Sequence, residues 1–158
     1  MWQRSCMKLA EALLERADLQ KRVESLQSRI VAAASYQEGE PPAEDASELL
    51  EQSIQAIAAL ELLVTAINLT NSTTVTPDGR SVTALLASRE ALRSQHSVLS
   101  RAAEAASGGW HQRQLRSELK QVSALPVKEL RAQADAVAKE IREIDSLIQR
   151  TNWEADLL

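Results

Sequence analysis

Apolar residues recur at intervals of three and four positions through most of this 158-residue sequence. That spacing places them on one face of an α-helix, and such a face is normally buried against another element. The pattern predicts four long helices, at residues 7–34, 47–71 and 83–106 and from Pro126 to about residue 152. The fourth helix has the most regular apolar face. The third has the weakest, because half of that face is small or polar.

The composition supplies only aliphatic side chains for a core. There is one Tyr and no Phe, and four Gly and four Pro leave few positions that break a helix. We therefore expect an all-α protein, an antiparallel bundle of four long helices arranged as two helical hairpins. The predicted buried faces are Leu9, Ala12, Arg16, Leu19, Val23, Leu26, Ile30 and Ala33; Leu50, Ile54, Ile57, Leu60, Val64 and Ile67; Leu85, Arg89, Leu92, His96, Leu99 and Ala103; and Val127, Leu130, Ala134, Val137, Ile141, Ile144, Ile148 and Thr151.

A chain of this length normally forms one domain, so we expect a single helical domain over 1–158. Residues 1–6 precede the periodic pattern and are interpreted as a flexible extension, which leaves open whether Met1 or Met7 is the native start. Glycine and proline pairs mark connectors at 36–46 and 107–126. Ser47 is the predicted N-cap of the second helix.

A Pro-Asp-Gly turn at residues 77–79 lies between β-branched residues on both sides. This pattern is typical of two strands joined by a tight turn. The sequence therefore predicts a short β-ribbon at residues 73–83, capping the end of a helical hairpin.

The ends of the second and fourth helices resemble each other. The sequence Ile-Asn-Leu-Thr-Asn at 67–71 matches Ile-Gln-Arg-Thr-Asn at 148–152. Asparagine is not favoured inside helices, so Asn71 and Asn152 are predicted to be helix-end caps. The repeat suggests an internal duplication of the helical hairpin.

Charge is unevenly distributed along the chain. No Lys or Arg occurs between Ile30 and Gly79, where eight acidic residues lie, whereas residues 89–131 hold eight basic and four acidic residues. Complementary blocks on long helices can set the register of self-association, so we expect a homo-oligomer. The net charge of −4 argues against nucleic acid as a partner. A single cysteine, Cys6, suits a reducing cytoplasm.

No catalytic constellation is visible. The chain lacks metal-binding spacings, phosphate-binding glycine loops and nucleophile elbows, so we expect no enzyme activity, no cofactor and no metal. The polar residues on the predicted faces, Arg16, Arg89 and His96, form a candidate interaction site. His96 is interpreted as a core histidine. The alternative is a ligand or a base that lies near Arg89 and Arg16 if the first and third helices are antiparallel.

The most apolar stretch, residues 54–69, is shorter than the roughly 20 residues that span a membrane. Glu61 lies in its middle. We interpret it as part of a buried helix and not as a permanent transmembrane segment.

Several motifs resemble those of a family of small bacterial helical proteins labelled septicolysin, whose function is unknown. The resemblance covers residues 7–22, Met-Lys-Leu-Ala-Glu-Ala-Leu-Leu-Glu-Arg-Ala-Asp-Leu-Gln-Lys-Arg, and the Ile67–Asn71, Asp78–Arg80 and Thr151–Trp153 motifs. The family label implies a cytolysin but provides no catalytic or binding residues to transfer. Two hypotheses follow. The first is a cytoplasmic structural or interaction protein that self-associates. The second is a membrane-active, pore-forming protein.

Overall fold

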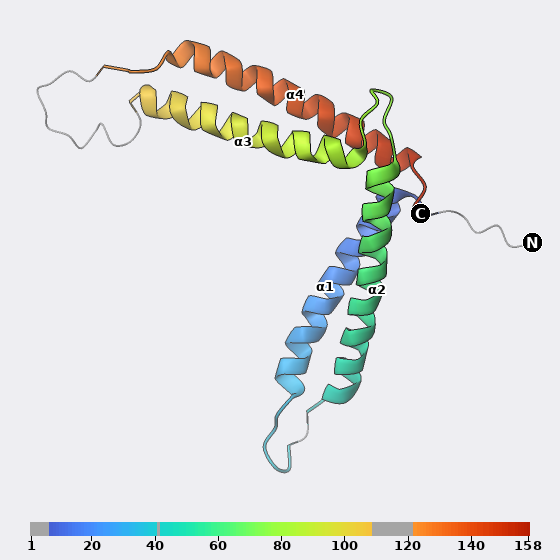
Figure 1. Ribbon diagram of the computed structural model, residues 1–158. Coiled ribbons are helices and arrows are strands. Elements are labelled where there is room, and N and C mark those ends of the chain that lie inside the picture. Colours follow the sequence, from blue (N-terminus) through green and yellow to red (C-terminus); the bar gives the residue numbers. More distant parts are fainter. Residues whose placement is uncertain (1–6, 41, 109–121) are drawn as a thin grey trace, which may run out of the picture. The chain divides into compact units, whose positions relative to one another are not determined.

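The computed structural model describes residues 7–40, 42–108 and 122–158, and these contain four α-helices and no β-strand. The helices are α1 (Leu9–Ala33), α2 (Ala46–Thr73), α3 (Val82–Ala106) and α4 (Val127–Glu154), as Figure 1 shows. The all-α class is therefore confirmed. The contacts divide the chain into two compact units, whereas one domain is predicted from its length. Unit 1 holds α1, α2 and residues 150–158, and unit 2 holds residues 76–149 with α3 and most of α4.

Local hydrogen bonds explain where the helices begin. The Glu11 side chain accepts a hydrogen bond from the Lys8 backbone N at 2.8 Å, at the start of α1. At α2 the cap is Asp45, whose Oδ1 accepts from the backbone N of Ser47 and of Glu48 at 2.7 and 3.3 Å. The predicted cap, Ser47, instead lies inside the first turn, because a carboxylate two residues earlier satisfies the exposed backbone donors.

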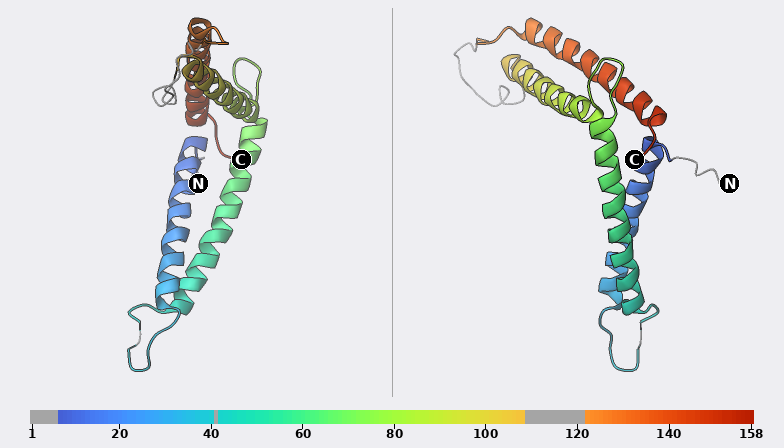
Figure 2. Two further views of the ribbon diagram at one scale, coloured as in Figure 1. Left: turned by 90° about the vertical axis from the view of Figure 1, so that its left-hand side faces the viewer. Right: turned by 45° about the vertical axis from the view of Figure 1, so that its right-hand side comes forward.

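In unit 1, α1 and α2 pack as an antiparallel hairpin, and the two run side by side in both views of Figure 2. One buried cluster joins Leu26 and Ala33 of α1 to Leu49 and Ala56 of α2. A second, at the other end of the hairpin, contains Leu9, Ala12 and Ile67. The predicted apolar face of α1 is thus the face that packs on α2.

The last residues of the chain close the second cluster. The Leu9 backbone N donates to the Ala155 carbonyl at 3.0 Å, and the Leu157 backbone N donates to the Met7 carbonyl at 2.8 Å. Lys8 pairs with Asp156 at 2.7 Å. Ala155 and Leu157 also pack against the buried cluster. We call residues 154–158 the C-terminal clasp.

In unit 2, α3 packs antiparallel on α4. Leu85, Ile144 and Ile148 form the buried cluster, with Leu86, Leu92 and Leu147 packed against it. Ala134 and Val137 are also buried. The predicted apolar faces of both helices therefore supply this core. Helix α3 ends at Ala106 with Ser107 as its C-cap, and Gly108 follows with a φ of 85°, a left-handed conformation that favours glycine.

The predicted β-ribbon at residues 73–83 is absent. Helix α2 continues to Thr73 and α3 begins at Val82, so only residues 74–81 lie between them. Thr76 closes a tight turn, because its backbone N donates to the Arg80 carbonyl at 2.9 Å and its Oγ1 lies 2.8 Å from the same oxygen. Gly79 has a φ of 83°. The turn satisfies its own polar groups, and too few residues remain to form paired strands.

Asn71 and Asn152 lie in the last turn of their helices, each two residues before the end. Helix α2 ends at Thr73 with Thr74 as its C-cap, and α4 extends to Glu154. The two asparagines therefore do not occupy the predicted capping positions. The predicted extension at 1–6 and most of the connector at 107–126 lie outside the described residues.

Candidate interaction surface

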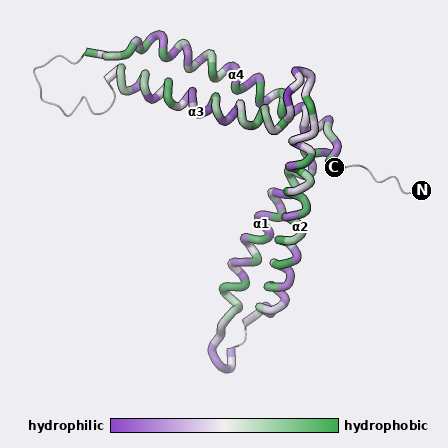
Figure 3. Tube along the Cα trace, in the orientation of Figure 1, coloured by the Kyte–Doolittle hydropathy of each residue, from purple (hydrophilic) through white to green (hydrophobic). Residues whose placement is uncertain are grey.

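Helix α2 carries two apolar rows on different sides. The inner row, Leu49, Ser53, Ala56 and Ile67, is buried in unit 1. The outer row is Leu50, Ile54 and Ile57, whose exposed fractions are 51%, 59% and 50%. Each outer residue follows an inner residue by one position, so the rows are about 100° apart around the helix. Hydrophobic residues accordingly recur along the length of α2 in Figure 3.

The sequence pattern predicts Leu50, Ile54 and Ile57 as part of the buried face, and the structure corrects this for these three residues. The rest of the predicted face, Leu60, Val64 and Ile67, is half-buried or buried. The inner row contains Ser53 and Ala56, and small residues allow two helices to approach closely. On the facing helix, Ala33 is small as well. The larger Ile54 and Ile57 would hold the helices further apart. The hairpin therefore packs through the less apolar of the two rows and leaves the more apolar one exposed.

The exposed surface of α2 also affects the interpretation of residues 54–69. Within the described residues, α2 is the one helix long and apolar enough to cross a membrane, with a mean hydropathy of 1.5 over its best window. Only 22% of that window is buried inside the structure. The prediction that this stretch is a buried helix is therefore wrong for most of its length.

The basic residues of the α1–α2 hairpin lie on α1, where acidic residues accompany them. Helix α2 contains Glu48, Glu51 and Glu61 and no basic residue. In α1, Arg29 donates hydrogen bonds from Nε and Nη2 to both carboxylate oxygens of Glu44, which precedes α2. These bonds lower the pKa of Glu44 and raise that of Arg29. This pair fastens the loop between the helices to α1.

The three predicted polar-face residues are divided between the units. Arg16 lies in α1 of unit 1, where its Nε is buried and makes no hydrogen bond in the described structure. Arg89 and His96 lie in α3 of unit 2. Neither unit alone brings the three side chains together.

Arg89 has a partner that the sequence analysis does not identify. Its Nη1 lies 3.3 Å from Oδ1 of Asp145 on α4, and Nη2 of Arg93 lies 3.5 Å from Oδ2 of the same residue. Asp145 follows the buried Ile144, so its position beside a predicted apolar face was a usable signal. An acidic partner on the facing helix offsets the cost of partly burying an arginine. This ion pair joins α3 to α4.

His96 lines a shallow pocket of about 340 Å³ at the other end of unit 2. Ser100 and Glu104 lie beside it on α3, and Arg131 and Asp135 line it from α4. The described residues contain no group of three His, Cys, Asp or Glu that could hold a metal ion. The pocket places a half-buried histidine among mixed charges.

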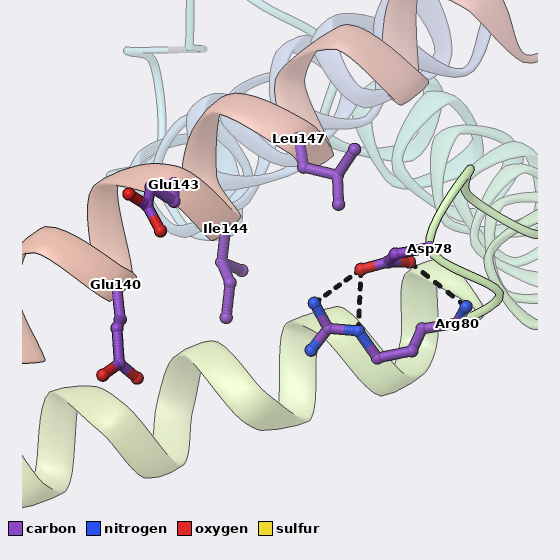
Figure 4. Close-up of a pocket in the computed structure, with 6 residues that line it drawn as sticks. All are labelled: Asp78, Arg80, Glu140, Glu143, Ile144 and Leu147. Atoms are coloured by element: carbon purple, nitrogen blue, oxygen red, sulfur yellow. Dashed lines mark hydrogen bonds and ion pairs between the residues drawn. The ribbon is translucent and has the colours of Figure 1, made fainter.

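A second shallow pocket, of about 360 Å³, lies where the turn before α3 faces α4. Figure 4 shows Asp78 and Arg80 from the turn, with Glu140, Glu143, Ile144 and Leu147 from α4. Thr76 donates a hydrogen bond from Oγ1 to Asp78 Oδ1 at 2.5 Å, and Arg80 donates from Nη2 to Oδ2 at 2.7 Å. These bonds, that of Thr76 first, lower the pKa of Asp78 from 3.8 to about 2. The pocket's basic residue is thus already paired.

Comparison with known proteins shows the family. A family model described as a family of unknown function, DUF6847, matches residues 16–157, and the chain belongs to that family. The chain is also similar to a solved structure described as a functionally unknown conserved protein from Corynebacterium diphtheriae. The two are 36% identical with a TM-score of 0.90, over 96% of this chain and 99% of that one. No curated protein matches the chain.

Proposed function

We propose that this member of a family of unknown function is a helical interaction protein that self-associates through the outer row of α2. The observation that carries this is the exposure of Leu50, Ile54 and Ile57, each at least half accessible to water. Half-exposed aliphatic residues are common one at a time. Three in one helical row form a continuous strip that water solvates poorly and that another apolar surface would cover.

The two rows of α2 also fit the geometry of a larger helical assembly. Each helix of a four-helix bundle packs against two neighbours, which lie at roughly right angles to each other. A two-helix hairpin uses only one of these directions. In α2 the inner row faces α1, and the outer row is about 100° away, the direction of a second neighbour. A hairpin from another copy of the chain would supply it.

This role is one of interaction and not of catalysis. The polar residue at the centre of the α3 face, Arg89, is paired with Asp145 and joins two helices. We place the protein in the cytoplasm on the strength of its single cysteine. The partner under this proposal is a second copy, and nucleic acid is not expected to bind.

Light scattering or sedimentation across protein concentration and salt tests the proposal. The wild-type chain should show a mass that is a multiple of 17.4 kDa. Ile54→Gln should shift the mass toward 17.4 kDa, because it places an amide in the middle of the outer row. Leu62→Gln is the matched control, since Leu62 is 74% exposed on the same helix but outside the row. A wild-type chain of 17.4 kDa under every condition would refute the proposal.

A second candidate function, membrane activity, has one observation in its favour. Helix α2 has 28 residues and a strongly apolar window that is mostly exposed. This suits the cytolysin label of the septicolysin family that the motifs resemble. Against it, Glu61 would carry a charge into the hydrocarbon. Dye release from liposomes of neutral and anionic lipid, at neutral and acidic pH, distinguishes the two: release supports membrane activity, and no release under any of these conditions removes it.

A further inference from the structure

The C-terminal clasp closes on the hairpin through a few hydrogen bonds. Two of them, from the backbone N of Leu9 and of Leu157, join it to the start of α1. A third reaches α2, where the Leu158 backbone N donates to Oγ1 of the buried Thr70 at 3.0 Å. That hydroxyl itself donates to the Ala66 carbonyl at 2.9 Å, so it accepts from Leu158 without losing its own acceptor. The clasp therefore bridges both helices of the hairpin at one end.

The side chains of the clasp add little to this closure. Lys8 pairs with Asp156, but the two side chains are 37% and 56% exposed, and an ion pair this open to water contributes little stability. Leu157 is half-buried. A segment held by a few hydrogen bonds and one half-covered leucine can open while the rest of its domain stays folded.

The opposite end of the hairpin has a core of its own. The cluster of Leu26, Ala33, Leu49 and Ala56 contains no residue of the clasp. Leu26 lies 17 positions after Leu9 in α1, which is about 25 Å along the helix at 1.5 Å per residue. Opening of the clasp would uncover the apolar cluster at its own end of the hairpin and leave this second core in place.

The clasp is the continuation of a helix that belongs to unit 2. Helix α4 runs unbroken to Glu154, although the division between the units falls at residues 149 and 150. The Ala155 backbone N still donates to the Thr151 carbonyl at 2.9 Å, which continues the helical pattern into the clasp. Ile148, in the core of unit 2, lies only three positions before Thr151. Because helix formation is cooperative, the packing of α3 on α4 supports the turn from which the clasp extends.

We propose that the C-terminal clasp opens and closes as one piece while the rest of the α1–α2 hairpin stays folded, and that the packing of unit 2 sets how often it opens. A change that loosens α3 from α4 would then expose Leu9 and Ile67, which lie in unit 1. This coupling runs along the chain through α4. It is independent of self-association through the outer row.

Amide hydrogen exchange in the full chain tests the proposal, with protection factors compared residue by residue. Leu9 is the first residue of α1, so its N–H has no acceptor inside the helix and is protected by the clasp alone. The Leu157 amide reports the same closure, and the Leu26 amide reports the hairpin. In the wild-type chain Leu9 and Leu157 should have equal protection factors, about tenfold or more below that of Leu26.

The decisive variant is Leu85→Ala, which removes a fully buried side chain from the core of unit 2. It should lower the protection of Leu9 and Leu157 by about tenfold or more, the smallest effect expected for a buried leucine, and leave that of Leu26 unchanged. Val98→Ala is the matched control, because Val98 lies on the same helix but is 67% exposed. It should leave all three amides unchanged.

A disulfide across the clasp separates its opening from a general loss of stability. Lys8 and Asp156 face each other in an antiparallel bridge, between the two backbone hydrogen bonds. Such pairs have Cα atoms about 4.5 Å apart, which a disulfide can span. In a chain with Cys6→Ser, Lys8→Cys and Asp156→Cys, oxidation should abolish the effect of Leu85→Ala on Leu9, and reduction should restore it. This comparison holds even if Leu85→Ala unfolds unit 2 completely.

Three results would overturn the proposal. Unequal protection factors at Leu9 and Leu157 in the wild-type chain would show that the clasp does not open as one piece. Protection of Leu9 that is unchanged by Leu85→Ala would show that unit 2 does not control it. A loss of protection at Leu26 equal to that at Leu9 would show that the clasp and the hairpin unfold together.

Discussion

Two adjacent leucines of α2 provide the sharpest stability test. Leu49 is 3% exposed and packs in the hairpin core, whereas Leu50 is 51% exposed. Both substitutions to alanine remove the same atoms from the same helix turn, so helix propensity cancels in the comparison. We expect Leu49→Ala to lower the free energy of unfolding by about 2–3 kcal/mol, the lower part of the range for buried leucine, because its neighbours Ala33 and Ala56 are small and few contacts are lost.

For Leu50→Ala the expected cost is about 1 kcal/mol. The substitution removes three carbons worth about 0.8 kcal/mol each when fully buried, and only half of this side chain is covered. No closed cavity is left, so no further penalty is added.

Urea unfolding followed by circular dichroism measures both values. The measurement should be made at a protein concentration low enough to disfavour association, and then repeated at a higher one. Self-association through the outer row predicts that the cost of Leu50→Ala rises with concentration while that of Leu49→Ala stays constant. Equal costs for Leu50→Ala and Leu49→Ala in the dilute protein would contradict the assignment of Leu50 to an exposed row and Leu49 to the core.

Three further predictions concern the turn, the C-terminal clasp and the α3–α4 ion pair. The folded-state pKa of Asp78 is about 2, below its ordinary 3.8, so its stabilising contribution is full above about pH 4 and is lost as the pH falls toward 2. Asp78→Asn should remove this loss from the pH dependence of the free energy of unfolding. An unchanged pH dependence in the variant would contradict the prediction. Deleting residues 155–158 should lower the free energy of unfolding by about 3 kcal/mol, because the backbone hydrogen bonds to Met7 and Leu9 and the half-buried Leu157 side chain are lost. Equal urea midpoints for the full and the shortened chain would show that the C-terminal clasp adds no stability. Asp145→Asn should lower the free energy of unfolding by about 1 kcal/mol, because Arg89 and Arg93 lose their shared partner. This loss should become smaller in high salt, which screens the ion pair. A loss that does not depend on salt would indicate a packing effect instead.

The helices and most of their buried faces could be predicted from the sequence. Periodicity is a local property, and in α1 and α4 one apolar face dominates, whereas in α3 the weaker face still has no competing apolar row. In α2 two apolar rows compete. Residue hydrophobicity favours the outer row, but the packing distance between helices favours the inner row with Ser53 and Ala56. That distance depends on the side chains of both α1 and α2, so the sequence of one helix does not determine it.

The errors at the turns have a similar cause. The Pro-Asp-Gly sequence at 77–79 predicts a tight turn correctly, but a turn becomes a ribbon only if strands remain on both sides, and here the helices extend to Thr73 and Val82. The ion pair between Arg89 and Asp145 can be predicted only if the register in which α3 packs on α4 is known. Side-chain pairs across elements are the part of a candidate site that local patterns do not specify.

The C-terminal clasp ties the order of synthesis to the order of folding. Helices α1 and α2 emerge from the ribosome first and can pair at once, because the contacts between them are close in sequence. The hydrogen bonds from Leu9 to Ala155 and from Leu157 to Met7, however, wait until all of unit 2 has been made. During translation the first hairpin therefore exists with Leu9 and Ile67 uncovered at one end. A chain that lacks residues 150–158 would therefore leave this apolar end of the hairpin uncovered.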